Sequence, residues 1–378
     1  MAVYDQAVTT YSDTTPHMRV VSNVIQFIDP RDIPLIDYLG GLDAAKSKLS
    51  IRGNGTKIEI LEDEFRPLTS AVADDADVTD DSTVTSFDVA DASVFHVGDV
   101  LAASAEYLWV SARDVTNNTV TVVRGFGGTQ ATLASDAAIT IVGQARLEGA
   151  DASYGPIVDI TAPYNYTNIF EKGLQVTGTM QHIDQYGISD ELAYQAGKAM
   201  PEQLRLVERA LYYSPRNAGS GTAARSMGGL PTFVTTNSVN AGGSVVKADY
   251  DAAMEAAYGY GGFPDVAVMN HAVAKDLKDV IDTSAFVRFD QSESQVGTVP
   301  VRSIVTQFGQ LNVLMDRHCP VARSYVLQSD KVGLYTLRPF AMYDVAKTGD
   351  SEKVDLVGEL SFMVANDEAH AYIYGITS

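Results

Sequence analysis

Side chains that could do chemistry are scattered along this chain and do not gather into a motif. The six histidines show no metal-ligand spacing with one another; they stand at positions 17, 96, 182, 271, 318 and 370. Cys319 is the only cysteine, so no intrachain disulfide can form, and we interpret it as a small buried apolar residue. No serine or cysteine stands in a nucleophile motif. The sequence therefore predicts no catalytic residue and no metal site.

Two short stretches have compositions that could bind an ion or a phosphate. The first is an acidic run, which lacks the ordered alternation, the glycine and the terminal glutamate of a calcium loop. Its aspartates are Asp74, Asp75, Asp77, Asp80 and Asp81. The second is RGFGGT at 124–129, which no expected helix follows, so it fails the test for a nucleotide-binding loop. We interpret them as a solvated acidic turn and a tight strand connection, and we expect no cofactor.

Composition bounds the class of protein. The chain has 378 residues, 46% of them hydrophobic, which suffices for two or three domains. Its 27 basic and 48 acidic residues give a formal charge of -21, and such a surface repels phosphate backbones. No uninterrupted apolar stretch reaches the roughly 18 residues needed to span a membrane, and no signal peptide is visible at the start. We expect the protein to be synthesised in a cytoplasm and not to associate with a membrane.

The first part of the chain reads as an arm. Residues 17–28, HMRVVSNVIQFI, have one apolar helical stripe, and Asp29-Pro30 ends that helix. The following RDIPLIDYLGG is irregular but half apolar. It cannot bury its apolar side chains by itself, so we expect it to lie on a surface of its own subunit or of a neighbour. These side chains are Ile33, Leu35, Ile36 and Leu39.

Strand-like segments follow the arm. Residues 47–68 and 155–183 have extended character, and the chain between them differs in composition. Residues 73–145 carry 11 acidic residues against two arginines, and they read as several short strands. Asn117-Asn118 is typical of a two-residue hairpin turn. We interpret 73–145 as an inserted β domain, a small barrel or sandwich, at the end of a long two-stranded arm.

The longest helical pattern runs over residues 189–213, with Ser189 as its expected N-cap. Pro201 stands in its middle, where a proline costs about 3 kcal/mol. We favour a single bent helix whose two halves are held by packing. The alternative is that one helix ends near Ala199 and a second begins with Pro201 in its first turn. The chain after this helix alternates strands and helices, so the fold class is α+β.

In this order the elements resemble the tailed-bacteriophage major capsid protein family, in a branch with an inserted β domain in the extended-loop region. The phrase NVIQFIDPRDIPLIDYLGG is similar to the family's N-terminal arm. TNIFEKGLQVTGTMQHIDQYGISDELAYQAGKAMPEQLRLVERALYY is similar to the returning loop and the spine helix. DVAVMNHAVAKDLKDVI is similar to an axial-domain strand and helix, and LRPFAMYDVAKTGDSEKVDLVGELSFMVANDEAHAYIYGI to the closing strands.

The resemblance implies a division of the chain. The N-terminal arm is 1–46, and the extended loop with peripheral strands is 47–72 and 146–186. The inserted β domain is 73–145, and the spine helix with its loop is 187–227. The axial domain is 228–340, and 341–378 are C-terminal peripheral strands.

It also implies a non-enzymatic major capsid protein that assembles into an icosahedral virion shell around double-stranded DNA. Assembly is implied to proceed through heterologous contacts of the N-terminal arm, the extended loop and the axial domain between subunits. The implied partners are copies of itself in hexamers and pentamers, together with portal, scaffolding and decoration proteins. Assembly in the host cytoplasm is implied, and DNA is enclosed without specific binding. The expected assembly residues are Ile33, Leu35, Lys46, Lys48, Arg52, Lys57 and Pro201.

Two alternatives stay open. The basic cluster of Lys46, Lys48, Arg52 and Lys57 either contacts an acidic neighbouring subunit or packaged DNA, or is a solvated strand pair with cations on its edge. The alternative function is a phage tail or adhesin protein whose β domain binds carbohydrate, with Tyr107 and Trp109 as stacking platforms, although single aromatics on strands more often belong to a core.

Overall fold

The computed structural model describes residues 32–42, 48–49, 51, 53–73, 84–151, 154–155, 157–183, 188–283 and 303–377. The helix expected at 17–28, the acidic run at 74–81, Lys46 and Arg52 lie outside these ranges. The chain divides into two compact units. Unit 1 comprises Met1–Ile60 and Tyr164–Ser378, and unit 2 comprises Leu61–Pro163. Both helices and sheets are present, so the predicted α+β class is confirmed.

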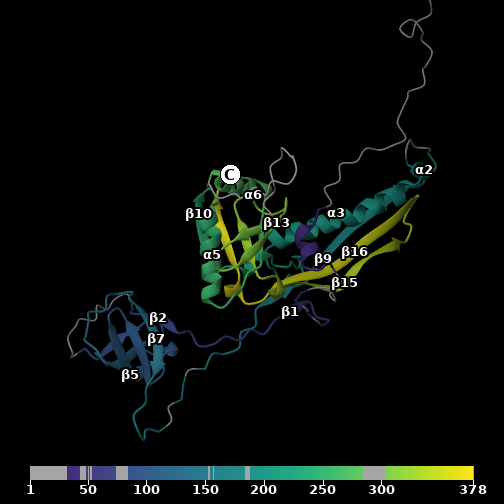
Figure 1. The fold of residues 1–378 in the computed structure, drawn as a ribbon. Helices are drawn as coiled ribbons and strands as arrows, with labels where there is room; N and C mark the ends of the chain where they lie inside the picture. Colours follow the sequence, from purple (N-terminus) through teal and green to yellow (C-terminus); the bar gives the residue numbers. More distant parts are fainter. Residues whose placement is uncertain are drawn as a thin grey trace, which may run out of the picture. The chain divides into compact units, whose positions relative to one another are not determined.

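Unit 1 contains a mixed six-stranded sheet in the order β10-β17-β14-β11-β13-β12 (Figure 1). Its strands are β10 (Ser238–Gly243), β11 (Val266–Met269), β12 (Ser303–Val305), β13 (Gln310–Met315), β14 (Ser324–Leu327) and β17 (Ala371–Ile376). β11 and β14 lie at its centre, and every residue of both is buried. Helices α5 (Lys247–Gly259) and α6 (His271–Thr283) pack apolar side chains against this sheet, and together they form one hydrophobic core.

The second sheet of unit 1 is antiparallel, in the order β15-β16-β9. Its strands are β9 (Asn168–Thr177), β15 (Val332–Val345) and β16 (Ser351–Val364). The expected boundary at 340/341 is wrong, because it falls within β15. The expectation that 341–378 are all peripheral strands is wrong as well, because β17 pairs with β10 and β14 in the six-stranded sheet.

The long helix α3 (Glu191–Tyr213) lies along the three-stranded sheet (Figure 1). It is one continuous helix with Pro201 inside it, so the alternative of two helices is wrong. The N-cap is Asp190, not Ser189: the Asp190 carboxylate accepts a hydrogen bond from the backbone of Ala193 at 3.1 Å. An aspartate here both satisfies a free N–H and faces the positive end of the helix dipole.

The remaining described elements of unit 1 are short. They are α1 (Pro34–Tyr38), β1 (Lys57–Glu59), β8 (Tyr164–Tyr166), α2 (Gly178–Gln181), α4 (Leu230–Phe233), η2 (Ser329–Lys331) and η3 (Asp367–Ala369). β1 and β8 form a separate antiparallel pair. With three residues in each strand, this pair is much shorter than the long two-stranded arm that we expected.

Unit 2 is built on an antiparallel six-stranded sheet in the order β2-β7-β4-β5-β6-β3. Its strands are β2 (Thr69–Ala71), β3 (Ser86–Asp88), β4 (Asp99–Ala103), β5 (Glu106–Asp114), β6 (Thr119–Val123) and β7 (Ala138–Gln144), with η1 (Ala92–Val94) before β4. Alternate residues of the central strands point into one apolar core. The β domain is therefore present, but it is wider than 73–145, because β2 precedes residue 73.

The hairpin between β5 and β6 differs from the expected two-residue turn. Residues 115–118 form a four-residue turn, and only Asn118 of the predicted Asn117-Asn118 pair has a positive φ, of 53°. The Asp114 side chain closes the loop by accepting hydrogen bonds from the backbone of Thr116 and the side chain of Asn117. Asparagine tolerates the left-handed conformation, which explains why it ends this turn.

A buried ion pair explains the RGFGGT stretch. Arg124 donates to both carboxylate oxygens of Glu106, at 2.8 and 2.6 Å, and both side chains are almost fully buried. The backbone of Gly125 and of Ala131 also donates to Glu106, and Arg124 donates to the Ala131 carbonyl. Burial raises the pKa of Glu106, but Arg124 and the two backbone donors lower it by more. The stretch is thus a strand connection, as the sequence indicated, and the buried contacts of Arg124 and Glu106 hold it in place.

Candidate assembly surface

Large apolar side chains are exposed in the two segments of unit 2 that flank its sheet, residues 61–68 and 145–163, which we call the flanking segments. The apolar side chains exposed there are Leu61, Phe65, Leu68, Leu147, Tyr154, Ile157 and Ile160. Phe65 is 98% exposed, Tyr154 92% and Ile157 89%, so these side chains contribute almost nothing to the core of their own unit. Apolar surface concentrated in this way marks an interaction site.

The backbone of the flanking segments is bonded to the rest of unit 2 at the ends nearest its sheet, where the Leu68 carbonyl accepts a hydrogen bond from Ile141 at 2.7 Å and Ala145 donates one to the Gly98 carbonyl at 2.7 Å. Their one described strand-like pairing is a bridge in which Glu62 and Thr161 exchange two hydrogen bonds of 2.9 Å. The remaining described residues between this bridge and the sheet are extended or turn-forming, without a ladder. The exposed apolar side chains of these segments are therefore available to a neighbouring molecule.

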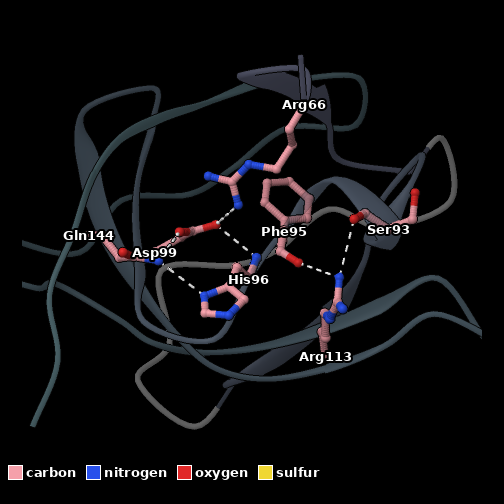
Figure 2. Close-up of polar contacts among 7 residues, drawn as sticks. All are labelled: Arg66, Ser93, Phe95, His96, Asp99, Arg113 and Gln144. Carbon is pink, nitrogen blue, oxygen red and sulfur yellow. Dashed lines mark hydrogen bonds and ion pairs between the residues drawn. The ribbon is translucent and has the colours of Figure 1, made fainter. Parts of the chain in front are cut away.

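A polar network attaches the incoming flanking segment to the sheet of unit 2 (Figure 2). The Asp99 carboxylate, at the start of β4, is fully buried and accepts hydrogen bonds from Nη1 of Arg66 at 2.9 Å and from the backbone of His96 at 2.7 Å. Gln144, at the end of β7, donates to Asp99 at 3.4 Å and lies 3.1 Å from Nδ1 of His96. The flanking segments thus begin at a fixed place.

The arm residues expected to need a surface find one on their own chain. Leu35, Ile36 and Leu39 are fully buried in the core that contains α3, β14 and β16, and Ile33 is half-buried against it. Leu35 is therefore not available to a neighbour from this position. Of the two alternatives, the contact of this part of the arm is with its own subunit.

The Glu208 side chain in α3 binds this part of the arm through the backbone N–H groups of the arm. Its Oε1 accepts a hydrogen bond from the backbone of Leu35 at 2.7 Å, and its Oε2 accepts one from Ile36 at 3.1 Å. Burial, together with the neighbouring Asp316 carboxyl, raises the pKa of Glu208 from 4.5 to about 9. Glu208 is thus protonated at neutral pH. Oδ2 of Asp316 is buried without a hydrogen-bond partner, and either a proton on Glu208 or the equally unpartnered Tyr212 hydroxyl would supply the donor that it lacks.

The described members of the basic cluster already have partners within the chain. Lys48 donates to the Ser329 hydroxyl at 2.7 Å and stands 4.1 Å from the centre of the Tyr38 ring. Lys57 pairs with Glu59, and its ammonium stands 4.3 Å from the centre of the Tyr164 ring. These contacts agree with a solvated strand edge and leave a further contact with a neighbour open. Pro201 is half-buried within α3.

Trp109 and Tyr107 are neither a free stacking pair nor core residues. The Trp109 indole N–H donates to the Ala145 carbonyl at 2.9 Å, and its ring stacks on Phe126 with centroids 6.5 Å apart. Tyr107 is 49% exposed. Among the described residues there is no group of three side chains able to hold a metal ion, and no helix long and apolar enough to cross a membrane.

The buried carboxyl groups are the residues that sequence reasoning missed. Glu208, Asp316 and Glu106 are acidic, and a prediction based on the pattern of apolar residues places acidic residues on the surface. The one available signal was local for Glu106, because it precedes the alternating apolar residues Leu108 and Val110 at the same two-residue spacing and so faces the core, where a carboxylate needs a buried cation. For Glu208 no local signal existed, since its partners lie about 170 positions away along the chain.

Solved structures with this fold are phage capsids and related particles. The cyanophage A-1(L) capsid matches with a TM-score of 0.55 at 12% identity, covering 98% of this chain and 99% of that chain. The capsid of a native GTA particle matches with a TM-score of 0.53 at 11% identity, covering 98% of each chain. A structure of Mycobacterium phage Bobi gives 0.51 at 10% identity, over 99% of this chain and 100% of that one. The fold is thus that of a tailed-phage capsid protein.

The family assignment is more specific than the fold. The model of the SU10 major capsid protein matches residues 5–377, and the chain belongs to this family. No curated protein matches it. The chain is therefore a structural protein that forms the shell of a virion capsid. This finding confirms the resemblance drawn from the sequence and favours it over the alternative of a tail or adhesin protein.

Proposed function

We propose that this protein assembles into an icosahedral shell that encloses double-stranded DNA, and that the flanking segments form its principal contacts between subunits. The observation that carries the proposal is the exposure of Phe65, Tyr154 and Ile157 on segments that have no core of their own. Covering apolar surface releases about 25 cal/mol per Å². A shell repeats each contact in every subunit, so individually modest interfaces suffice.

The work of the protein on this proposal is association and not bond chemistry. Hexamers and pentamers of the chain would be joined by the arm, by the flanking segments and by the six-stranded sheet domain. Portal, scaffolding and decoration proteins are further partners, and assembly takes place in the host cytoplasm. The net charge of -21 repels phosphate groups, which agrees with a wall that encloses DNA without binding it specifically.

Electrostatic attraction between subunits is a second element of the proposal. Unit 2 has 17 acidic residues, four arginines and no lysine, a net charge of -13. The cluster of Lys46, Lys48, Arg52 and Lys57 belongs to the other unit. We infer that this cluster faces unit 2 of a neighbouring subunit, in which case assembly should slow as salt screens the charges.

The double variant Phe65→Ser, Ile157→Ser tests the role of the flanking segments. Both side chains are almost fully exposed, so the variant subunit should fold and melt like the wild type. It should fail to form closed shells in electron micrographs. The matched control is Phe65→Leu, Ile157→Val, which keeps the apolar surface and should form shells. Closed shells of normal yield from the serine variant would refute the proposed contacts.

A further inference from the structure

Unit 2 contains a cavity of about 520 Å³ beside the flanking segments, which contribute Arg66, Pro67, Gly155, Ile157 and Val158 to its lining. Its polar lining consists of Arg66, Arg113, Asp91 and Ser93, and its apolar lining includes Val94 and Val115. A space of this size holds a small molecule or one or two side chains of another chain. Two guanidinium groups in one cavity of such an acidic unit require an explanation.

Both arginines are held in fixed positions by buried or backbone acceptors (Figure 2). Nη1 of Arg66 donates to the fully buried Asp99 carboxylate at 2.9 Å. Nη1 of Arg113 donates to two backbone carbonyls, that of Phe95 at 2.6 Å and that of Ser93 at 3.2 Å. A guanidinium oriented in advance loses less conformational entropy when it binds a ligand.

Within the part of the chain that the structure describes, most of the donors on these two groups have no acceptor. A guanidinium carries five N–H groups, and the contacts above engage only Nη1 of each arginine. Among the described residues, Nε and Nη2 of Arg66 and Arg113 have no acceptor. Arg113 also has no carboxylate partner there, whereas Arg66 pairs with Asp99 and Arg124 with Glu106. Nε and Nη2 of one guanidinium form the fork that matches a carboxylate.

We infer that this cavity binds a carboxylate attached to an apolar group, with Arg113 as the principal ligand of the carboxylate and Arg66 as the second. The apolar part would lie against Val94 and Val115. The Asp91 carboxylate, which accepts a hydrogen bond from the backbone of Ser93 at 2.8 Å, also lines the cavity. Its negative charge disfavours a ligand group that carries two charges at one place, as phosphate does.

The carboxylate could come from a free organic acid or from a second copy of this chain. The chain itself carries an acidic and apolar segment, LEDEF at 61–65, whose Leu61 and Phe65 are exposed. Both sources present the same chemistry to Arg113. They are distinguished by comparing a small acid with a peptide of this segment.

The test is isothermal titration calorimetry, which measures the affinity of the full chain for each of three ligands. These are 4-methylpentanoate, its neutral amide and the capped pentapeptide of residues 61–65. We expect the acid or the peptide to bind and the amide to bind at least about ten-fold more weakly, since charge-assisted hydrogen bonds to a guanidinium are lost. Inorganic phosphate should bind more weakly than the acid. A peptide that binds ten-fold more tightly than the acid identifies the neighbouring chain as the source; otherwise the source is a free acid.

Arg113→Gln should weaken binding by about ten-fold or more. The matched control is Arg146→Gln, which removes the same charge from an arginine of this unit that donates to the Asp151 carbonyl and does not line the cavity. Because Arg113→Gln could also loosen η1, Val115→Glu, which fills the cavity with a like charge from a strand end, is tested in parallel and should abolish binding. Equal binding by wild type and both cavity variants, or no binding of acid and peptide to the wild type, would overturn the inference.

Discussion

Replacing Glu208 by glutamine tests the assignment of a proton to the group that holds the arm. Glutamine keeps one acceptor for the backbone of Leu35 or Ile36 and offers an amide N–H to the unpartnered Oδ2 of Asp316. It has no proton to lose. The variant therefore preserves the geometry while removing the titration.

The expected effect follows from the pKa of Glu208, which is about 9 in the folded chain against 4.5 ordinarily. Below pH 4.5 the group is protonated in both states and has no differential effect. Between pH 4.5 and 9 the unfolded chain ionises and the folded chain does not, so the free energy of unfolding falls as pH rises. Above pH 9 the loss is complete, at about 6 kcal/mol as an upper bound.

Urea unfolding of the unassembled chain at several pH values measures this loss. At pH 5 we expect Glu208→Gln to be less stable than wild type by about 1–3 kcal/mol, the cost of one weakened buried hydrogen bond. Between pH 6 and pH 8 the difference should move by about 3 kcal/mol in favour of the variant. Titrating groups that do not interact with residue 208 cancel in the comparison, because both chains share them.

Glu202→Gln is the matched control for this series. Glu202 lies on the same helix, and its side chain is 41% exposed and paired with Lys172. Its difference from wild type should be small and constant over the same pH range. A constant difference for Glu208→Gln as well would show that Glu208 is ionised in the folded chain, and the account of the shared proton with Asp316 would be refuted.

Four further substitutions probe the packing. Arg124→Met leaves the Glu106 carboxylate buried without its cation and should lower the free energy of unfolding by about 3–5 kcal/mol in urea titrations. Gly229→Ala places a Cβ 2.5 Å from the Leu211 carbonyl oxygen and should cost about 1–3 kcal/mol, whereas Gly197→Ala, with no atom within 4 Å, should gain about 0.5–1 kcal/mol. Pro201→Ala should straighten α3, and shells of unchanged shape and stability in electron micrographs would contradict a role of Pro201 in curvature.

The sequence predicted the features that depend on residues close together in the chain, such as the spacing of apolar residues in a helix or strand. The alternation in β5 and the helical stripe of α3 place Leu108, Val110, Val207 and Leu211 in cores, as their spacing indicates. These features depend on neighbours a few positions away, so a single sequence contains them. The stretch RDIPLIDYLGG, which we expected to be irregular, instead contains the helix α1, with Pro34 in its first turn.

Other features depended on partners distant in the chain. The position of β17 is set by pairing with β10 and β14. No local residue pattern indicates that the last strand belongs to this six-stranded sheet. The expected extended-loop ranges 47–72 and 146–186 include most of the candidate assembly surface, but its exposed apolar residues were not identified, for the opposite reason. Phe65 and Ile157 have residue types that ordinarily predict burial, and a single subunit does not contain the surface that would bury them.

The attachment of α1 shows why a buried carboxyl group is useful at a place where apolar packing alone would serve stability. α1 has five residues, too few for a helix to be stable by itself, and its side chains Leu35 and Ile36 could fit an apolar core in more than one register. Two backbone N–H groups aimed at one carboxyl group, at 2.7 and 3.1 Å, permit only one register. A buried acid costs free energy, so its place here is best explained by specificity. In a shell every subunit must start its arm from the same point, and a slip of one residue in α1 would misplace everything that precedes it in the chain.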